Sequence, residues 1–399
     1  MRDEKLVPFE GSRRAPDPRL VEEFAATARK LQRERESSAE LVARELRETP
    51  RSRWSELAQR GHLRSNGVLE RLSEEVESRL DRAPREALAV AELATDLAAS
   101  LPSDAYPAIT LAQARAHAWK DRGQALSYLG RYDEALEALA QAERQLEPFV
   151  TLAHDRAIVQ FVQATTLQEV SRYDESFALL TECKKVFRDH ADLRRGLLCG
   201  IAEAALFHRL ENYGQAREAY LALIDTARQL DDAKSLACLH NMIGHCSVSL
   251  GDYDAAERHL ALAVNLFMRL DQPLQAAKAE LAHGRVLLRR GQHENAIAHL
   301  TRIRKDFLRH DLIEEAGLCG LDIVEAQLLR GAAAEAEALA RRIVTDFTVA
   351  RLNDRAVVAL GYLANAIAER QSPLAMVERV RQYIVSLRKT PEREFIAFA

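Results

Sequence analysis

The side chains best suited to chemistry lie close together in the middle of the sequence, at Cys238, His240, His245 and Cys246. Thiolate sulfur and imidazole nitrogen are the ligands that zinc prefers, so this group is the best candidate for a metal site. Ligands on one helix face need spacings of about three or four residues, and Cys238, His245 and Cys246 do not converge at such spacings. We therefore predict that the cysteines are small packing residues of the interior and that the chain binds no metal or cofactor.

Common catalytic and nucleotide-binding motifs are absent from the sequence. There is no GxxxxGK(S/T) phosphate loop, no GxGxxG after a strand, no HExxH and no GxSxG. We predict that the chain is not an enzyme. A metal protein or enzyme centred on His240, His245 and Cys246 is the alternative, and stoichiometric zinc in the purified protein would support it.

Residues 54–72 have a spacing that is tolerable for a DNA-binding helix-turn-helix, although Gly61 stands one position early for the turn. Such a motif reads DNA through a basic recognition helix. Arg64 and Arg71 are available, but acidic residues such as Glu70 surround them. We therefore expect an N-terminal capping hairpin here, and no nucleic-acid partner.

The elements that position these residues are set by a repeat. Its aromatic position is filled in successive copies by Tyr132, Tyr173, Tyr213, Tyr253, His293 and Ala333, at steps of 41 and then 40 residues. A fixed period in this range is typical of a solenoid, in which each unit buries its apolar face against its neighbours.

Each copy predicts two antiparallel helices, which in the first copy run over about 114–129 and 132–147. Gly130 supplies the permissive turn between them. Small residues nine positions before and three positions after the aromatic position, Gly123 and Ala135 in the first copy, let the two helices approach closely.

These positions resemble the consensus of the tetratricopeptide repeat, although the unit here is longer than that family's repeat of about 34 residues. The resemblance covers roughly residues 108–388. It implies an all-α fold, a right-handed superhelical solenoid of about seven antiparallel helix pairs with an N-terminal helical cap. Longer units of this kind look like those of peptide-sensing bacterial regulators and signalling scaffolds. The matching residues of the first copy are Trp119, Gly123, Gly130, Tyr132, Ala135 and Ala142.

The chain divides into five predicted segments. Residues 1–50 form a charged arm, partly disordered or helical, and residues 51–107 form the N-terminal helical hairpin cap. Residues 108–350 hold six repeats, residues 351–390 a capping helix pair, and residues 391–399 an apolar tail. We expect the tail to dock on the last helix, and an exposed interaction peptide is the alternative.

The resemblance implies a binding groove on the concave side, lined by the first helix of each pair. Arginine and histidine bias repeats three to five toward positive potential, and arginine binds carboxylates bidentately, so we predict an acidic segment or a chain terminus as ligand. The alternative is that these are solvated polar positions. By register, the groove residues are Lys120, Gln124, Tyr128, Phe161, Thr165, Gln168, His208, Arg209, Asn241, His245, Arg285, Arg289, Glu325 and Asn365.

The bulk composition is that of a folded protein without an obvious charged partner. The net charge is −4, which does not indicate nucleic-acid or membrane-surface binding. No apolar run reaches the roughly 18 residues of a membrane span, and no signal peptide opens the sequence. Five cysteines without a CxxC pair fit a reducing compartment, so we predict a cytoplasmic, bacterial-type protein.

Together these features predict a non-enzymatic, regulatory scaffold that holds a protein or peptide segment in the concave groove. A peptide-sensing transcriptional or signalling regulator, whose ligand changes the superhelix, is the alternative. That version requires two conformations with different affinities for the ligand.

Overall fold

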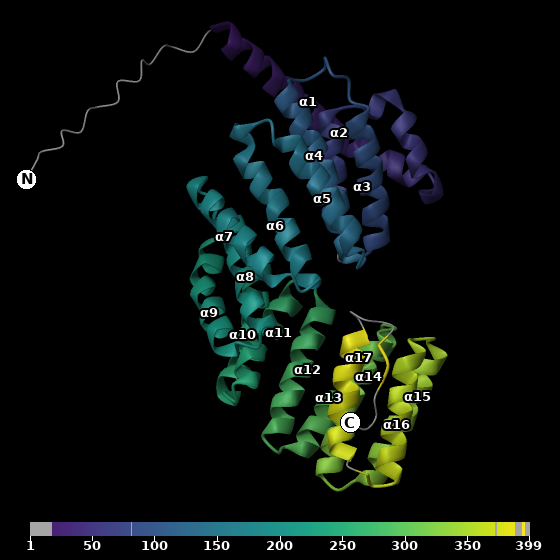
Figure 1. The fold of residues 1–399 in the computed structure, drawn as a ribbon. Helices are drawn as coiled ribbons and strands as arrows, with labels where there is room; N and C mark the ends of the chain where they lie inside the picture. The colour runs from purple at the N-terminus through teal and green to yellow at the C-terminus, as the bar shows by residue number, and fades with distance from the viewer. Residues whose placement is uncertain (1–17, 81, 372, 388–392, 396–399) are drawn as a thin grey trace, which may run out of the picture. The chain divides into compact units, whose positions relative to one another are not determined.

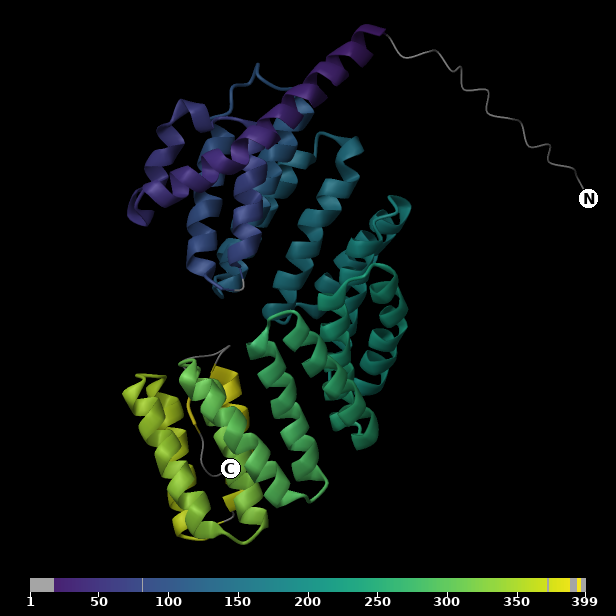
Figure 2. The same cartoon turned by 180° about the vertical axis from the view of Figure 1, so that it is seen from behind.

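The computed structural model describes residues 18–80, 82–371, 373–387 and 393–395, and these ranges contain helices but no strand. Figures 1 and 2 show the helices from opposite sides. Contacts between residues divide the chain into two compact units, Met1–Cys199 and Gly200–Ala399. The predicted all-α class is confirmed. Within the described ranges, no helix combines the length and the apolar character that a bilayer crossing requires.

Unit 1 holds the N-terminal segment and the first two helix pairs of the repeat. Its α-helices are α1 (Pro18–Glu48), α2 (Asn66–Arg79), α3 (Pro84–Ala99), α4 (Ala108–Tyr128), α5 (Tyr132–Leu146), α6 (Ala153–Glu169) and α7 (Tyr173–Asp189). Short 3-10 helices connect some of them, namely η1 (Arg51–Gln59), η2 (Gly61–Leu63) and η3 (Val150–Leu152).

Unit 2 begins inside α8 (Leu193–Arg209) and continues the alternation of first and second helices. Its further helices are α9 (Tyr213–Gln229), α10 (Ala233–Ser249), α11 (Tyr253–Arg269), α12 (Pro273–Arg289), α13 (His293–Arg309), α14 (Ile313–Leu329), α15 (Ala333–Val349), α16 (Asp354–Ala368) and α17 (Pro373–Leu387). The predicted domain boundaries stay predictions, because the contacts divide the chain at a different place, between Cys199 and Gly200.

The second helix of each pair begins at the aromatic position of the repeat, so that α5, α7, α9, α11, α13 and α15 all start there. Two residues before each start the backbone is left-handed, with φ of 73° at Gly130 and 74° at Gly251. Ser171 and Glu211 adopt the same conformation, with φ of 61° and 60°, at a cost of roughly 1–2 kcal/mol that glycine avoids. The repeat therefore requires a left-handed backbone at each of these turns, and glycine adopts that conformation at the lowest energetic cost.

Small residues bring the two helices of a pair into close contact, as predicted. A Cβ added at Gly123 would lie 2.7 Å from Cγ of Leu139, and one added at Gly244 would lie 2.6 Å from Cγ of Leu260. Ala135 is fully buried at the same crossing. The small residues that recur at these positions of the repeat are thus explained by helix packing.

Helix α1 is joined to the rest of unit 1 by hydrogen bonds of Lys30 and Glu34. The Glu34 carboxylate accepts a hydrogen bond from the Tyr106 hydroxyl at 2.7 Å and from the backbone N–H of Asn66 at 3.1 Å, at the start of α2. Lys30 donates to the carbonyl oxygen of Ala105 at 2.7 Å. The predicted arm is therefore helical from Pro18, and the disorder expected earlier in the arm lies outside the described residues.

The last helix does not simply extend the array. Helix α17 packs against α16 and also against α14, the first helix of the preceding pair (Figures 1 and 2). The Phe395 ring lies 4.9 Å from the Tyr383 ring and 5.9 Å from the Tyr362 ring, measured between centroids. Docking of the tail is confirmed for residues 393–395, while residues 396–399 lie outside the described ranges.

Candidate ligand site

Three successive first helices of unit 2 bring predicted groove residues together. His208 on α8 and Arg285 on α12 are near enough to affect His245 on α10 electrostatically. Burial, with the nearby charge of Arg285 and then His208, lowers the pKa of His245 to about 4, so this imidazole is neutral at pH 7. The site therefore offers a neutral imidazole beside a guanidinium.

Asn241 adds an amide to the same face, one turn before His245 on α10. Its Oδ1 atom is buried, and within the described part of the chain no donor bonds it. A buried acceptor without a donor costs about 1–3 kcal/mol, so the position is suited to an incoming N–H group. This unbonded acceptor, one turn from His245, makes Asn241 a candidate contact for a ligand.

Arg285 and Arg289 are already paired with carboxylates of α14. Arg285 Nε lies 2.8 Å from Asp322 Oδ2, and Arg289 Nη1 lies 2.9 Å from Glu325 Oε1. The positive potential predicted from these two arginines is therefore offset within the protein. Glu325 was predicted as a groove residue from its register, whereas Asp322 was not, although it lies 37 residues after Arg285, close to one repeat.

A second missed residue, Arg381 of α17, contacts the same carboxylates. Its Nη2 lies 3.0 Å from Asp322 Oδ1 and 2.6 Å from Glu325 Oε2, and its Nη1 also contacts Glu378. Because α17 covers α14, Glu325 is only 8% exposed and is not the open groove residue that its register predicted. The sequence around Arg381 does not indicate that the final helix folds back on an earlier helix pair.

Six of the predicted groove residues belong to unit 1, and two of them lie in its interior. Lys120 is 7% exposed and pairs with Asp121, while Gln168 is 4% exposed and donates to Ser176 Oγ at 3.3 Å. Thr165 donates to the carbonyl oxygen of Val162. The remaining three are Gln124, Phe161 and Tyr128, of which Tyr128 is half exposed.

Two more predicted residues belong to unit 2. Arg209 is half-buried on α8, and Asn365 is exposed on α16. Burial, and then the nearby charge of Arg209, lowers the pKa of His208. The candidate site therefore centres on α8, α10 and α12.

The candidate metal residues are separated by other contacts. His240 Nδ1 lies 2.9 Å from Nδ1 of His259 on α11. Burial raises the pKa of the Cys246 thiol to about 11, so it stays protonated at pH 7. Among the described residues, no three or more histidine, cysteine, aspartate or glutamate side chains are placed to hold a metal ion.

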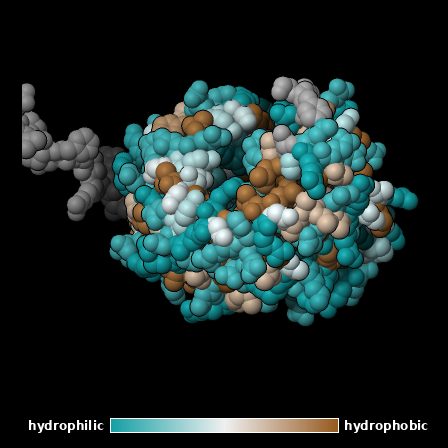
Figure 3. Space-filling view, turned by 90° about the horizontal axis from the view of Figure 1, so that it is seen from below, coloured by the Kyte–Doolittle hydropathy of each residue, from teal (hydrophilic) through white to brown (hydrophobic). Residues whose placement is uncertain are grey.

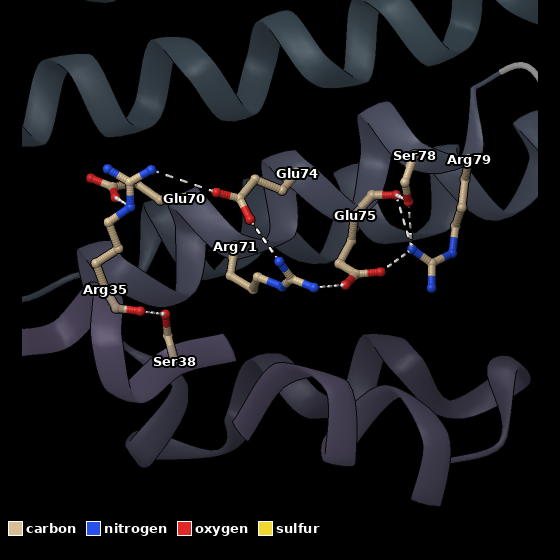
Figure 4. Close-up of polar contacts among 8 residues, drawn as sticks. All are labelled: Arg35, Ser38, Glu70, Arg71, Glu74, Glu75, Ser78 and Arg79. Carbon is tan, nitrogen blue, oxygen red and sulfur yellow. Dashed lines mark hydrogen bonds and ion pairs between the residues drawn. The ribbon is translucent and has the colours of Figure 1, made fainter. Parts of the chain in front are cut away.

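Arg71, a basic residue of the candidate DNA-reading helix, is paired with carboxylates of its own helix. Figure 4 shows that Arg71 on α2 binds Glu74 at 2.7 Å and Glu75 at 2.8 Å, while Arg79 also contacts Glu75. The opposite face of α2, including Val68 and Leu72, is buried. This arrangement disfavours a helix that enters a DNA groove and is consistent with a capping segment.

An apolar cavity of about 400 Å³ lies apart from this site, between α11, α12 and α13. Met268, Leu274 and Phe307 line it, and Glu280 and Arg302 stand at its polar edge. Figure 3 shows that apolar side chains also gather in places on one face of an otherwise mainly hydrophilic surface. The cavity has no buried polar group that would select a ligand.

Comparison with known proteins supports the fold. A family model described as Tetratricopeptide repeat matches residues 116–144. The apo form of the quorum sensor NprR from B. thuringiensis has a TM-score of 0.58 at 13% identity, covering 92% of this chain and 99% of that one. A Rap protein complexed with competence and sporulation factor has a TM-score of 0.51 at 18% identity, covering 89% and 100%. At these identities the likeness shows the fold alone.

The class is thus a helical-hairpin solenoid that carries a tetratricopeptide-repeat match at residues 116–144. Response regulator aspartate phosphatase J of Bacillus subtilis (strain 168) is 27% identical over 104 residues. The match covers 26% of this chain and 28% of that relative, so it spans little more than a quarter of the relative's length.

Proposed function

We propose that this chain is a regulatory protein that binds a peptide on the first-helix face of α8, α10 and α12 and acts by binding rather than by catalysis. The observation that carries the proposal is the buried, unbonded Oδ1 of Asn241, one turn from His245, which the charges of His208 and Arg285 affect. An extended peptide has unpaired N–H groups that can satisfy such an acceptor. A preformed helical scaffold also lowers the ordering cost on the receptor side.

Similar proteins support a peptide ligand. One neighbour of the same fold was solved with competence and sporulation factor, and another is named a quorum sensor. The curated relative carries a regulatory name, response regulator aspartate phosphatase J. These names favour a peptide-sensing regulator of cytoplasmic, bacterial type over a general scaffold.

The ligand's charge is the finer part of the proposal. Arg285 and Arg289 are 35% and 49% exposed, and each guanidinium has five N–H donors, so both can bind a ligand carboxylate beside their protein partners. An acidic segment or a chain terminus fits this geometry. Because Asp322 and Glu325 offset both charges, we expect a modest rather than a dominant contribution from ligand charge.

The proposal is tested with a pooled library of synthetic peptides passed over the immobilised full-length protein, with the retained peptides read by mass spectrometry. We expect the wild type to retain a subset, and Asn241→Ala to lose it. Asn265→Ala, at an exposed position on α11, is the matched control and should retain the same subset. Identical retention by all three proteins would place the ligand elsewhere.

A further inference from the structure

We infer that Arg381 of α17 is a positioning residue of the candidate ligand site, acting through Asp322 and Glu325 on Arg285 and Arg289. The inference rests on the proposed function, because it concerns the arginines that would meet the ligand. It assigns α17 a role beyond closing the end of the array: ligand binding and the docking of α17 are coupled.

The coupling has a continuous physical path. Asp322 uses its two oxygens for two different helices, with Oδ2 toward Arg285 of α12 at 2.8 Å and Oδ1 toward Arg381 of α17 at 3.0 Å. Glu325 repeats the arrangement, with Oε1 toward Arg289 at 2.9 Å and Oε2 toward Arg381 at 2.6 Å. Two carboxylates of α14 thus bridge the arginines of α12 to a single arginine of α17.

Burial makes this bridge sensitive to charge. Asp322 is 1% exposed and the Arg381 side chain is 12% exposed, so water screens their interaction little. Burial alone would lower the pKa of the Arg381 guanidinium, but Asp322, Glu325 and Glu378 raise it above its usual value, and the group remains charged. A buried carboxylate that loses a partner is strongly destabilised, so Asp322 must keep at least one guanidinium.

Two cations that share a carboxylate oppose each other. Arg285 and Arg381 both attract Asp322, and they repel each other across it. If a ligand carboxylate neutralises Arg285, Asp322 can interact more fully with Arg381, and α17 is held more tightly. By linkage, tighter docking of α17 must favour the ligand to the same degree.

The alternative is that α17 is only a cap. Its buried residues Val377, Val380 and Ile384 pack in the core with α16 and α14, and they alone could keep it in place. If α17 is only a cap, a change in Asp322, which contacts Arg381, would alter hydrogen exchange in α17. A change in Arg285 would leave exchange in a simple cap unaltered, because Arg285 belongs to α12 and reaches Arg381 only through Asp322.

Hydrogen exchange of the α17 amides in the full-length protein distinguishes a coupled α17 from a simple cap, and it needs no ligand. Arg285→Gln should slow exchange in α17, and Asp322→Asn should accelerate it, each on the order of two- to tenfold, as for coupled residues of one network. Arg269→Gln, at an exposed position on α11, is the control and should leave exchange in α17 unchanged. Unchanged or faster exchange in Arg285→Gln overturns the inference.

The positioning of Arg285 by Arg381 is measured with the NMR signal of the Arg285 Nε–H group. This signal is assigned by its loss in Arg285→Gln. We expect Arg381→Gln to shift this signal and Arg381→Lys to restore it in part, because lysine keeps the charge without the fork. An unshifted signal in a folded Arg381→Gln protein also overturns the inference. Since neither measurement uses a peptide, failure of peptide binding alone would count against the proposed function and not against this coupling.

Discussion

Gly244 shows how strictly the repeat constrains single residues. It lies in the first helix of its pair, where an added Cβ would approach Leu260 Cγ to 2.6 Å. We predict that Gly244→Ala lowers the free energy of unfolding by about 1–3 kcal/mol, as overpacking does. Urea denaturation measures this change.

Gly214 is the matched control for that substitution. It also lies in a helix, near the start of α9, but nothing stands within 4 Å of its added Cβ. Gly214→Ala should therefore be neutral or stabilise the protein by up to about 1 kcal/mol, because alanine favours the helix. Equal losses in both variants would contradict the packing explanation.

The His240–His259 pair makes stability depend on pH. Burial and then the neighbouring His259 lower the pKa of His240 to about 4, whereas it is about 6.5 in the unfolded chain. Between these values the unfolded state binds more protons, so stability falls as the pH falls from about 6.5 to about 4. We predict a shallower decline for His240→Asn, measured by denaturation at several pH values. A decline of equal slope in both proteins would show that the pair does not titrate in this window.

At the scale of elements, Glu34 is one of several residues that dock α1, beside the buried Val42 and Leu46 and the Glu45 carboxylate that contacts Arg60. Glu34 joins α1 to the first turn of α2 and to Tyr106, and it stays beneath the surface with a side-chain exposure of 17%. Glu34→Gln should weaken this attachment by about 1–3 kcal/mol and accelerate amide exchange along α1. Glu36→Gln, an exposed position on the same helix, should leave that exchange unchanged.

The elements also show what a sequence can predict. Turn positions and small packing residues recur with the period, so the starts of the second helices and the close crossings at Gly123 and Gly244 could be foreseen. The bond between Glu34 and Tyr106 could not, because it joins residues 72 positions apart and depends on no repeat. The same holds for Arg381, which pairs with Glu325 across 56 residues because α17 folds back on α14.

At the scale of the whole molecule, each helix pair is stabilised mainly by its neighbours. A local defect should therefore spread over adjacent pairs and not over the whole chain. We predict that Gly244→Ala accelerates amide exchange in α10, α11 and the helices that contact them, while α2 and α3 of unit 1 keep wild-type rates. Uniform acceleration throughout both units would indicate that the chain unfolds as one cooperative body.

The candidate site itself was only partly predictable. Register placed His208, Asn241, His245 and Arg285 on first helices, and the structure brings them to one face of unit 2. Register could not show that Asp322 and Glu325 would neutralise the arginines, because salt bridges between helices depend on side-chain directions that a period does not specify. Charge counted from sequence therefore omits the carboxylate partners of Arg285 and Arg289, and the acidic ligand stays a prediction.

The central claim is that a peptide binds on the first-helix face of unit 2 and donates an N–H group to Asn241. Isothermal titration of a peptide retained from the library, into wild type, Asn241→Ala and Asn265→Ala, tests it most directly. We predict that Kd rises about tenfold in Asn241→Ala, the loss of roughly one hydrogen bond, and is unchanged in Asn265→Ala. The same Kd in all three proteins would contradict the claim.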